Sequence, residues 1–177
     1  MQELQIIDST LSEQKKKVES LVNTLEFIDC GEFNEETNLD FLDYSGVYLL
    51  EIFSEQHQSL DIDSWLSTFK ENWDTDIAKD KSTPSTKQKR LKHHTELFEF
   101  MPFYLGKSEK ISTRLNSHIN LKFSQRTYGL KLIERGFFEQ YKLRLKVCKI
   151  DVINYNIIVP IVEDYLREKF QPIVGNK

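Results

Sequence analysis

Hydrophobic residues near the start of the chain recur at steps of three and four positions. The stripe consists of Leu4, Ile7, Leu11, Val18, Leu21 and Leu25, with Gln14 filling one slot. This spacing is typical of an amphipathic helix, which we expect over about residues 2–27 of an N-terminal helical segment 1–30. The apolar stripe would pack either on its own domain or on the same helix of a second subunit.

Three later segments have the pattern of β-strands. Residues 46–53 are rich in β-branched and aromatic side chains, and residues 99–105 form a second apolar run. Pro102 in the second run cannot donate a ladder hydrogen bond, so that strand is expected at a sheet edge or with a bulge. Residues 143–152 alternate apolar and polar positions, as a half-buried strand does. We expect the three segments in one sheet.

The remaining periodic segments predict helices. A short helix is expected near residues 63–73, within a long polar stretch. Another is expected over residues 108–121, with Ser108 as its N-cap and with Ile111, Leu115 and Ile119 packed on the sheet. A third is expected to begin near Pro160, a residue suited to a first helical turn, and to end before Pro172.

Composition limits the class of protein. The 177 residues suggest a single domain spanning 1–177, and 39% hydrophobic with 29% charged residues is typical of a soluble globular protein. Two distant cysteines, Cys30 and Cys148, fit a reducing cytoplasm better than a disulfide framework. We expect no signal peptide and no membrane contact, because no apolar run approaches the length of a span. The net charge of −4 means that any DNA-binding surface must be a local basic patch.

Two tripeptides carry the strongest functional signal. Gly46-Val47-Tyr48 opens the first strand, and Tyr104-Leu105-Gly106 lies in the second. Further along the chain come Lys107, Arg114, His118, Glu163 and Asn176. In this order and spacing the set resembles the GIY-YIG nuclease family. The resemblance covers residues 46–176, with 54–98 as an insertion. It implies a small α/β (α+β) domain with a central, three-stranded, mostly antiparallel sheet flanked by helices.

The resemblance also implies roles for these residues. Tyr48 would activate the attacking water, and Glu163 would bind Mg²⁺ or Mn²⁺, with Tyr104 and Asn176 completing the catalytic set. The phenol of Tyr48 has an ordinary pKa of about 10, so Lys107 or the metal would have to lower it. His118 would orient one of the tyrosines or relay a proton.

Elementary chemistry supports a phosphate site independently of the family. Arg114 and His118 are four residues apart, so they share one face of the expected helix. Lys107 would project from the N-terminal end of that helix, an end that favours anions. The planar guanidinium of Arg114 can bridge two phosphate oxygens, and a carboxylate such as Glu163 can hold a hard divalent cation.

The insertion separates Tyr48 from Tyr104 by 55 residues. We expect the insertion and the N-terminal helix to lie outside the minimal nuclease core and to tune DNA binding or assembly. The insertion carries a basic run with the cationic residues Lys87, Lys89, Arg90 and Lys92. This run either contacts the DNA backbone or forms a solvated loop.

The sequence therefore predicts a metal-dependent endonuclease that hydrolyses phosphodiester bonds of DNA. A restriction or phage-defence type is favoured, because 177 residues leave no room for the additional domains of repair and homing nucleases. A homodimer would suit the cutting of two strands. The alternative is a non-catalytic DNA-binding or protein-interaction module that retains the nuclease fold.

Overall fold

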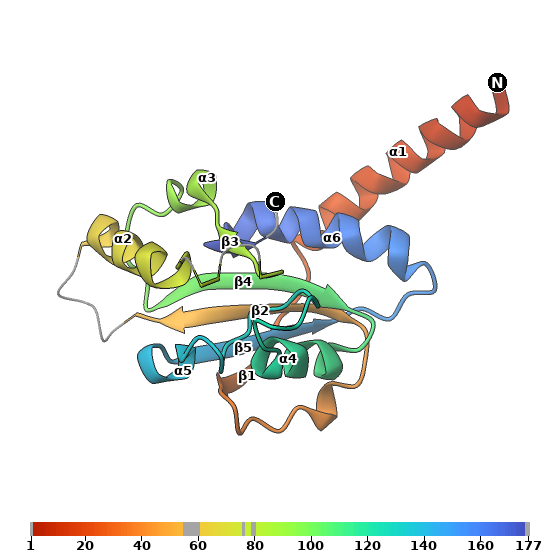
Figure 1. The fold of residues 1–177 in the computed structure, drawn as a ribbon. Helices are drawn as coiled ribbons and strands as arrows, with labels where there is room; N and C mark the ends of the chain where they lie inside the picture. Colours follow the sequence, from red (N-terminus) through yellow and green to blue (C-terminus); the bar gives the residue numbers. More distant parts are fainter. Residues whose placement is uncertain (1, 55–60, 76, 79–80, 176–177) are drawn as a thin grey trace.

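The computed structural model describes residues 2–54, 61–75, 77–78 and 81–175, which form a mixed sheet with helices on both faces (Figure 1). The sheet has six strands in the order β1-β5-β2-β4-β6-β3, so the predicted three-stranded sheet is too small. The three strands expected from the sequence form its centre: β2 (Gly46–Phe53) pairs antiparallel with β4 (Phe100–Ser108) and with β5 (Leu143–Lys149).

Strand β2 is central because its residues are apolar on both faces. Val47 and Leu49 point to one side of the sheet, while Tyr48, Leu50 and Ile52 point to the other. All five are almost fully buried. A strand buried on both faces needs a covering layer on each side, and the helices supply the two layers.

Strand β1 (Ile28–Phe33) was not predicted, and its sequence explains why. It pairs with β5 at the sheet edge, and its register shifts between Asp29 and Glu32. Gly31 lies at this irregularity with a φ of 79°, a conformation that glycine adopts without strain. A bulged, mostly exposed edge strand does not show the alternation by which strands are recognised. The N-terminal helix is correspondingly shorter than expected.

The predicted irregularity at Pro102 is present as a break in register. Leu50 pairs with Tyr104, whereas the next residue, Glu51, pairs with Pro102, so Phe103 is the extra residue. Beyond β4 lie two short strands that the sequence did not indicate, β6 (Val174–Gly175) and β3 (Ser85–Thr86). The pairing of β6 with β4 is parallel at Tyr104 and leaves the later part of β4 without a strand on that side among the described residues.

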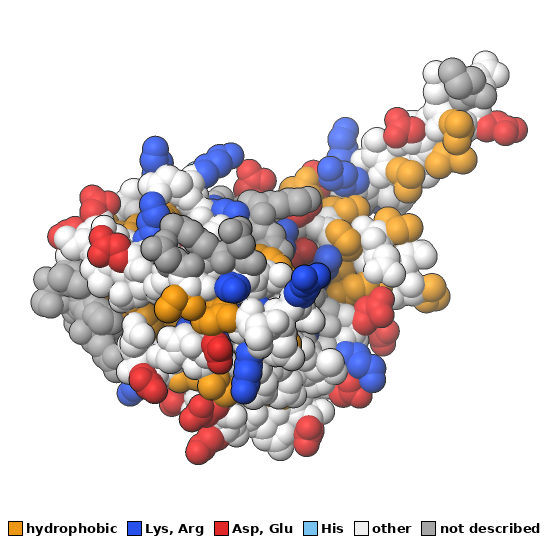
Figure 2. Space-filling model, viewed as in Figure 1, with side chains coloured by type: hydrophobic (Ala, Val, Ile, Leu, Met, Phe, Trp, Pro, Cys, Tyr) orange, Lys and Arg blue, Asp and Glu red, His pale blue; other side chains and the backbone are white. Residues whose placement is uncertain are grey.

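One face of the sheet is covered by α6 (Tyr155–Phe170) and by the end of α1 (Gln2–Val22). Val22 packs with Val47 and Leu49 in this layer, so the C-terminal end of α1 belongs to its own domain. The rest of α1 projects away from the body, with hydrophobic side chains along it (Figures 1 and 2). No helix in the described part of the chain could cross a membrane.

Helix α6 begins five residues before the position predicted for it. Its N-cap is Asn154, and Pro160 lies inside the helix instead of in its first turn. As a result Glu163 lies in the middle of α6 and not near its start, which was the position that the family resemblance implied.

The opposite face carries the larger core, covered by α4 (Ile111–Asn120), α5 (Phe137–Gln140), the 3-10 helix η1 (Asp40–Leu42) and α2 (Ile62–Trp73). Helix α4 packs on the sheet through the three predicted residues, Ile111, Leu115 and Ile119, all of which are buried.

The predicted N-cap of α4 was wrong. Ser108 ends β4, and Lys110 is the N-cap residue of α4. The Ser108 hydroxyl accepts from the Lys110 N–H at 3.0 Å and donates to the Lys110 carbonyl at 2.7 Å, so it forms the turn before the helix. Lys107 is therefore a strand residue and does not project from the helix N-terminus.

The insertion contributes to the main core, contrary to the expectation that it lies outside. Trp65, Phe69 and Trp73 of α2 are buried and stack on one another. Phe69 and Trp73 also contact Phe103 of β4 and Phe137 of α5 edge to face. The polar composition of residues 54–98 concealed three aromatic side chains at helical spacing. Residues 55–60, 76 and 79–80 of the insertion lie outside the described residues.

The short helix α3 (Gln88–Leu91) carries Lys89 and Arg90 of the basic run, and Lys87 and Lys92 flank it. Leu91 is buried in the main core, and the backbone N–H of Lys87 donates to the Ile173 carbonyl at 3.1 Å. These contacts fix the backbone of the basic run beside the end of α6, while the side chains of Lys89 and Lys92 are exposed to solvent.

Candidate active site

Two tyrosines from the centre of the sheet form the base of the candidate site. Tyr48 of β2 lies opposite Gly106 of β4, and Tyr104 lies opposite Leu50, so both phenols occupy the same sheet face. Their ring centroids are 6.3 Å apart. A side chain at Gly106 would overlap the Tyr48 phenol and crowd the Tyr104 ring. The glycine of the second tripeptide is therefore required for Tyr48 to lie across β4.

His118 holds the hydroxyl of Tyr48 from helix α4. Its Nε2 lies 2.7 Å from the Tyr48 hydroxyl, and its Nδ1 accepts the backbone N–H of Leu130 at 3.0 Å. An N–H group can donate but cannot accept, so Nδ1 must carry the lone pair and Nε2 the proton. His118 therefore donates to Tyr48, and the Tyr48 hydroxyl proton is left for another acceptor.

This tautomer decides what His118 can do. The imidazole is fully buried, and burial, followed by the charge of Arg114, lowers its pKa well below the ordinary 6.5. The ring is neutral near pH 7 with its one acceptor nitrogen occupied, so in this arrangement it cannot take a proton from Tyr48. Of the two predicted roles, the geometry supports orientation of Tyr48 and not proton relay.

Arg114 supplies the cation beside the phenols. Its Nη1 donates to the Tyr128 carbonyl at 2.8 Å, which anchors the half-buried guanidinium. Burial raises the pKa of both Tyr48 and Tyr104, and the charge of Arg114 opposes this shift at both residues. The sequence assigned this role to Lys107 or a metal, but the structure has Arg114 at the phenols, and Lys107 is engaged elsewhere.

Lys107 and Glu163 meet on the other side of β4. Lys107 lies opposite Val47, on the face that α6 covers, and its Nζ is 3.5 Å from Glu163 Oε2. The other carboxylate oxygen, Oε1, accepts from Arg167 Nη2 at 2.6 Å. Burial raises the pKa of Glu163, and Arg167 followed by Lys107 opposes the rise. The carboxylate is thus buried between two cations.

The charge of Glu163 acts on both tyrosines, although Glu163 and the tyrosines lie on opposite faces of the sheet. The Glu163 charge raises the pKa of Tyr48 and of Tyr104. The end of β4 near Gly106 has no flanking strand among the described residues, so groups from both faces can meet around this edge. Of the predicted set, Asn176 lies outside the described residues.

The side chains that could serve as ligands limit how a metal ion can bind. Across the described residues there is no group of three or more His, Cys, Asp and Glu side chains that could hold an ion. Glu163 could therefore offer a cation a single carboxylate, and a Mg²⁺ ion that retains several water ligands can be held in this way. A cation there would have to displace Lys107 or Arg167 from a carboxylate oxygen, and the two existing ion pairs show that this position attracts positive charge.

The predicted DNA-binding residues divide into two groups. Lys87, Lys89 and Arg90 line a cavity of about 500 Å³ against the end of α6. Lys92 instead lines a separate cavity beside α2, together with Lys70. The basic run is thus not one continuous surface.

Sequence reasoning missed two residues that hold the site. Arg167 follows Glu163 by four positions, a helical spacing at which opposite charges pair, so it could have been found. Tyr128 acts through its backbone carbonyl, which any residue type provides, and no sequence signal marks it.

No protein-family model, no curated protein and no solved structure matches this chain.

Proposed function

We propose that this chain hydrolyses phosphodiester bonds of DNA with the help of a divalent cation, as its resemblance to GIY-YIG nucleases suggests. The single observation that supports this most is the constellation at β4. Residues far apart in sequence, Tyr48, Tyr104, Arg114 and His118, form one hydrogen-bonded and electrostatically coupled group, and the charge of Glu163 acts on it. The half-buried guanidinium of Arg114 brings a positive charge to two buried phenols, where it can also act on a phosphate.

Each residue has a role that its contacts permit. Tyr48 receives a hydrogen bond from His118 Nε2, which would stabilise a phenolate more than a phenol. Arg114 lies beside both phenols, so it can offset negative charge on Tyr48 and on a phosphate in the same place. Tyr104 adds a hydroxyl that can donate to a phosphate oxygen.

Glu163 is the residue that would hold the cation. When bound, Mg²⁺ would supply polarisation of a phosphate oxygen and offset charge in the transition state. Lys107 and Arg167 hold the carboxylate in place between two cations, and a phosphate that approaches would offer both cations an alternative partner.

A second function is favoured by one observation. Tyr48 has no exposed surface, and both oxygens of Glu163 are engaged in ion pairs. A DNA-binding module that has retained the fold without catalysis would have these properties.

Plasmid cleavage separates the two functions. Wild-type protein is incubated with supercoiled plasmid in Mg²⁺ and in EDTA, and DNA affinity is measured in parallel by gel shift. We expect nicking in Mg²⁺ alone, abolished by Tyr48→Phe with little change in affinity, and abolished by Arg114→Ala with weaker binding. Binding without cleavage by the wild type in Mg²⁺ and in Mn²⁺ would favour the non-catalytic module.

A further inference from the structure

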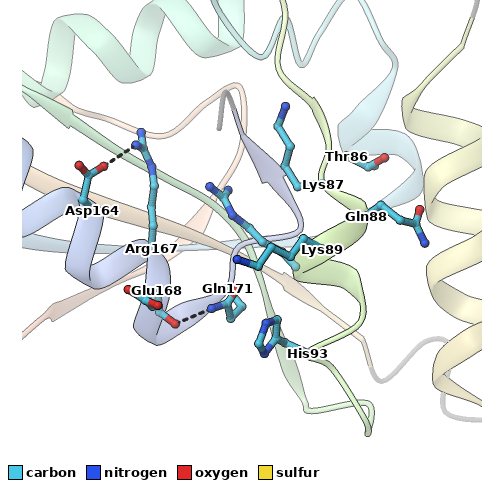
Figure 3. A pocket seen from close by; sticks show the side chains of 10 residues that line it. Thr86, Lys87, Gln88, Lys89, His93, Asp164, Arg167, Glu168 and Gln171 are labelled. Atoms are coloured by element: carbon cyan, nitrogen blue, oxygen red, sulfur yellow. Dashed lines mark hydrogen bonds and ion pairs between the residues drawn. The ribbon is translucent and has the colours of Figure 1, made fainter.

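A cavity of about 500 Å³ lined by several basic side chains lies between α3 and the end of α6, outside the tyrosine site (Figure 3). Its cationic lining comprises Lys87, Lys89, Arg90 and Arg167, against the carboxylates of Asp164 and Glu168. The cavity therefore has two more cationic than anionic side chains, in a chain whose net charge is −4. Positive charge is concentrated here against the overall balance.

The fold positions two guanidinium groups of this cavity. Arg90 Nη1 donates to the Pro172 carbonyl at 3.4 Å, and its guanidinium packs so closely on Gly175 that a side chain there would overlap it. Arg167 is held by Glu163 and, at 3.3 Å, by Asp164. Burial lowers the pKa of Arg90, the charge of Arg167 lowers it further, and the carboxylate of Asp164 opposes the shift. The two guanidiniums therefore line the same cavity as like charges. An anion between them would relieve the repulsion between these like charges.

The two lysines add positive charge on flexible side chains, which can turn toward a ligand. Lys89 extends from α3 toward α6, whereas its neighbour Gln88 points away toward α2 (Figure 3). Lys87 makes a weak contact with the Ser85 hydroxyl at 3.3 Å. Flexible ammonium groups around fixed guanidiniums are a common means of binding phosphate.

The cavity is joined to the candidate active site by one side chain. Arg167 lines the cavity, and its Nη2 holds Glu163 at 2.6 Å. Four helical residues correspond to about 6 Å along the axis of α6. The backbone positions of Glu163 and Arg167 are thus separated along α6 by slightly less than two nucleotide steps of one DNA strand, which rise about 3.4 Å each.

We propose that this cavity binds a backbone phosphodiester of the DNA strand whose neighbouring phosphate lies at Glu163. The inference rests on the proposed function for its choice of DNA. The cavity positions the strand, and Lys87 and Lys89 provide two of its phosphate contacts. Lys92, although part of the same basic run, does not belong to this site.

The test compares two double variants that remove the same charge. Lys87→Ala/Lys89→Ala removes two lysines from this cavity, and Lys70→Ala/Lys92→Ala removes two from the cavity beside α2. Affinity for a fluorescent DNA duplex is measured by anisotropy in EDTA over a salt series, so that no cleavage is needed. Thermal melting confirms that both variants fold.

We expect the first variant to lose about tenfold or more in affinity and about two units of salt slope, since each phosphate contact contributes about 0.9. The control should lose less than about threefold. Equal losses in the two variants, or no binding by the wild type, would overturn the proposal. Inorganic phosphate at the same total phosphate concentration should not displace the duplex, and full displacement would instead assign the cavity to a free phosphate.

The cleavage and binding measurements together show which of the two proposals fails. If wild-type protein cuts plasmid in Mg²⁺ but both double variants bind DNA equally, the cavity assignment fails and the nuclease proposal stands. If the first variant alone loses affinity while the wild type cuts nothing in any divalent cation, the cavity assignment stands and the nuclease proposal fails.

Discussion

At the scale of single residues, the hydrogen-bond pattern of His118 has the widest consequences. The Leu130 N–H occupies Nδ1, so the tautomer is fixed by the backbone and not by the ligand. The same N–H would oppose protonation of the ring, because an imidazolium has no acceptor nitrogen. His118 is therefore a fixed hydrogen-bond donor to Tyr48 in the folded protein.

The buried His118 predicts how stability depends on pH. Its pKa is lowered in the folded state, so the unfolded chain binds more protons below about pH 6.5. Its contribution to stability is present above that pH and is lost as the pH falls, at up to about 1.4 kcal/mol per pH unit. We expect the free energy of unfolding, measured by urea denaturation, to fall between pH 7 and pH 5.

His94 provides the matched control, because burial also lowers its pKa, although it is partly exposed. In His118→Gln most of the slope should disappear, whereas in His94→Gln most of it should remain. If the free energy of unfolding of His118→Gln depends on pH as strongly as that of the wild type, other groups cause the pH dependence. The assigned tautomer of His118 would then not contribute to stability.

At the scale of elements, the sequence predicted those parts whose pattern is set by their own burial. Strand β5 and helix α4 were found because their apolar residues repeat with the period of the element, and β2 was found because it is rich in β-branched and aromatic residues. The bulged edge strand β1 and the two-residue strands β3 and β6 were missed, because tertiary pairing defines them and their sequences carry no period.

The residues of the candidate site also divide into those that the sequence predicted and those that it missed. The family motif gave the tyrosines, Arg114, His118 and Glu163, which the fold brings near one another. It could not give the pairing of Glu163 with Lys107, because that pairing depends on how α6 crosses the sheet. Lys107 was expected near Tyr48, but Arg114 is the cation beside the phenols.

The aromatic residues of α2 predict that the insertion is part of the folding unit. Phe69 is buried among Trp65, Trp73 and Phe103, so Phe69→Ala should destabilise the protein by about 3–5 kcal/mol. Glu71→Ala, on the exposed face of the same helix, should change stability by less than about 0.5 kcal/mol. Guanidinium denaturation measures both. A cost below about 1 kcal/mol for Phe69→Ala would show that α2 docks as a separable addition.

At the scale of the whole molecule, most of α1 does not pack on the rest of the protein. Residues 2–17 are all exposed, including Leu4, Ile7 and Leu11, and packing begins at Val18 (Figure 2). Deletion of residues 2–17 should leave the melting temperature of the monomer within about 2 °C. The comparison is made at low and high protein concentration.

The deletion also tests the predicted homodimer. If the apolar stripe pairs with a second copy, full-length protein should sediment as a dimer, gain melting temperature with concentration, and lose both properties on deletion. A fall of several degrees in the dilute monomer would contradict the account of α1 as an element without packing in its own body over these residues.

The central claim is that Glu163 serves cation-dependent phosphodiester hydrolysis, and one comparison tests it most directly. The rate of plasmid nicking in Mg²⁺ is measured for wild type, Glu163→Gln and Asp164→Asn. Glu163 lies between Lys107 and Arg167, whereas the Asp164 side chain is mostly exposed. We predict a loss on the order of 100-fold or more for Glu163→Gln, with DNA binding retained, and a near-normal rate for Asp164→Asn. Wild-type nicking by Glu163→Gln, or loss of nicking confined to Asp164→Asn, would contradict the account.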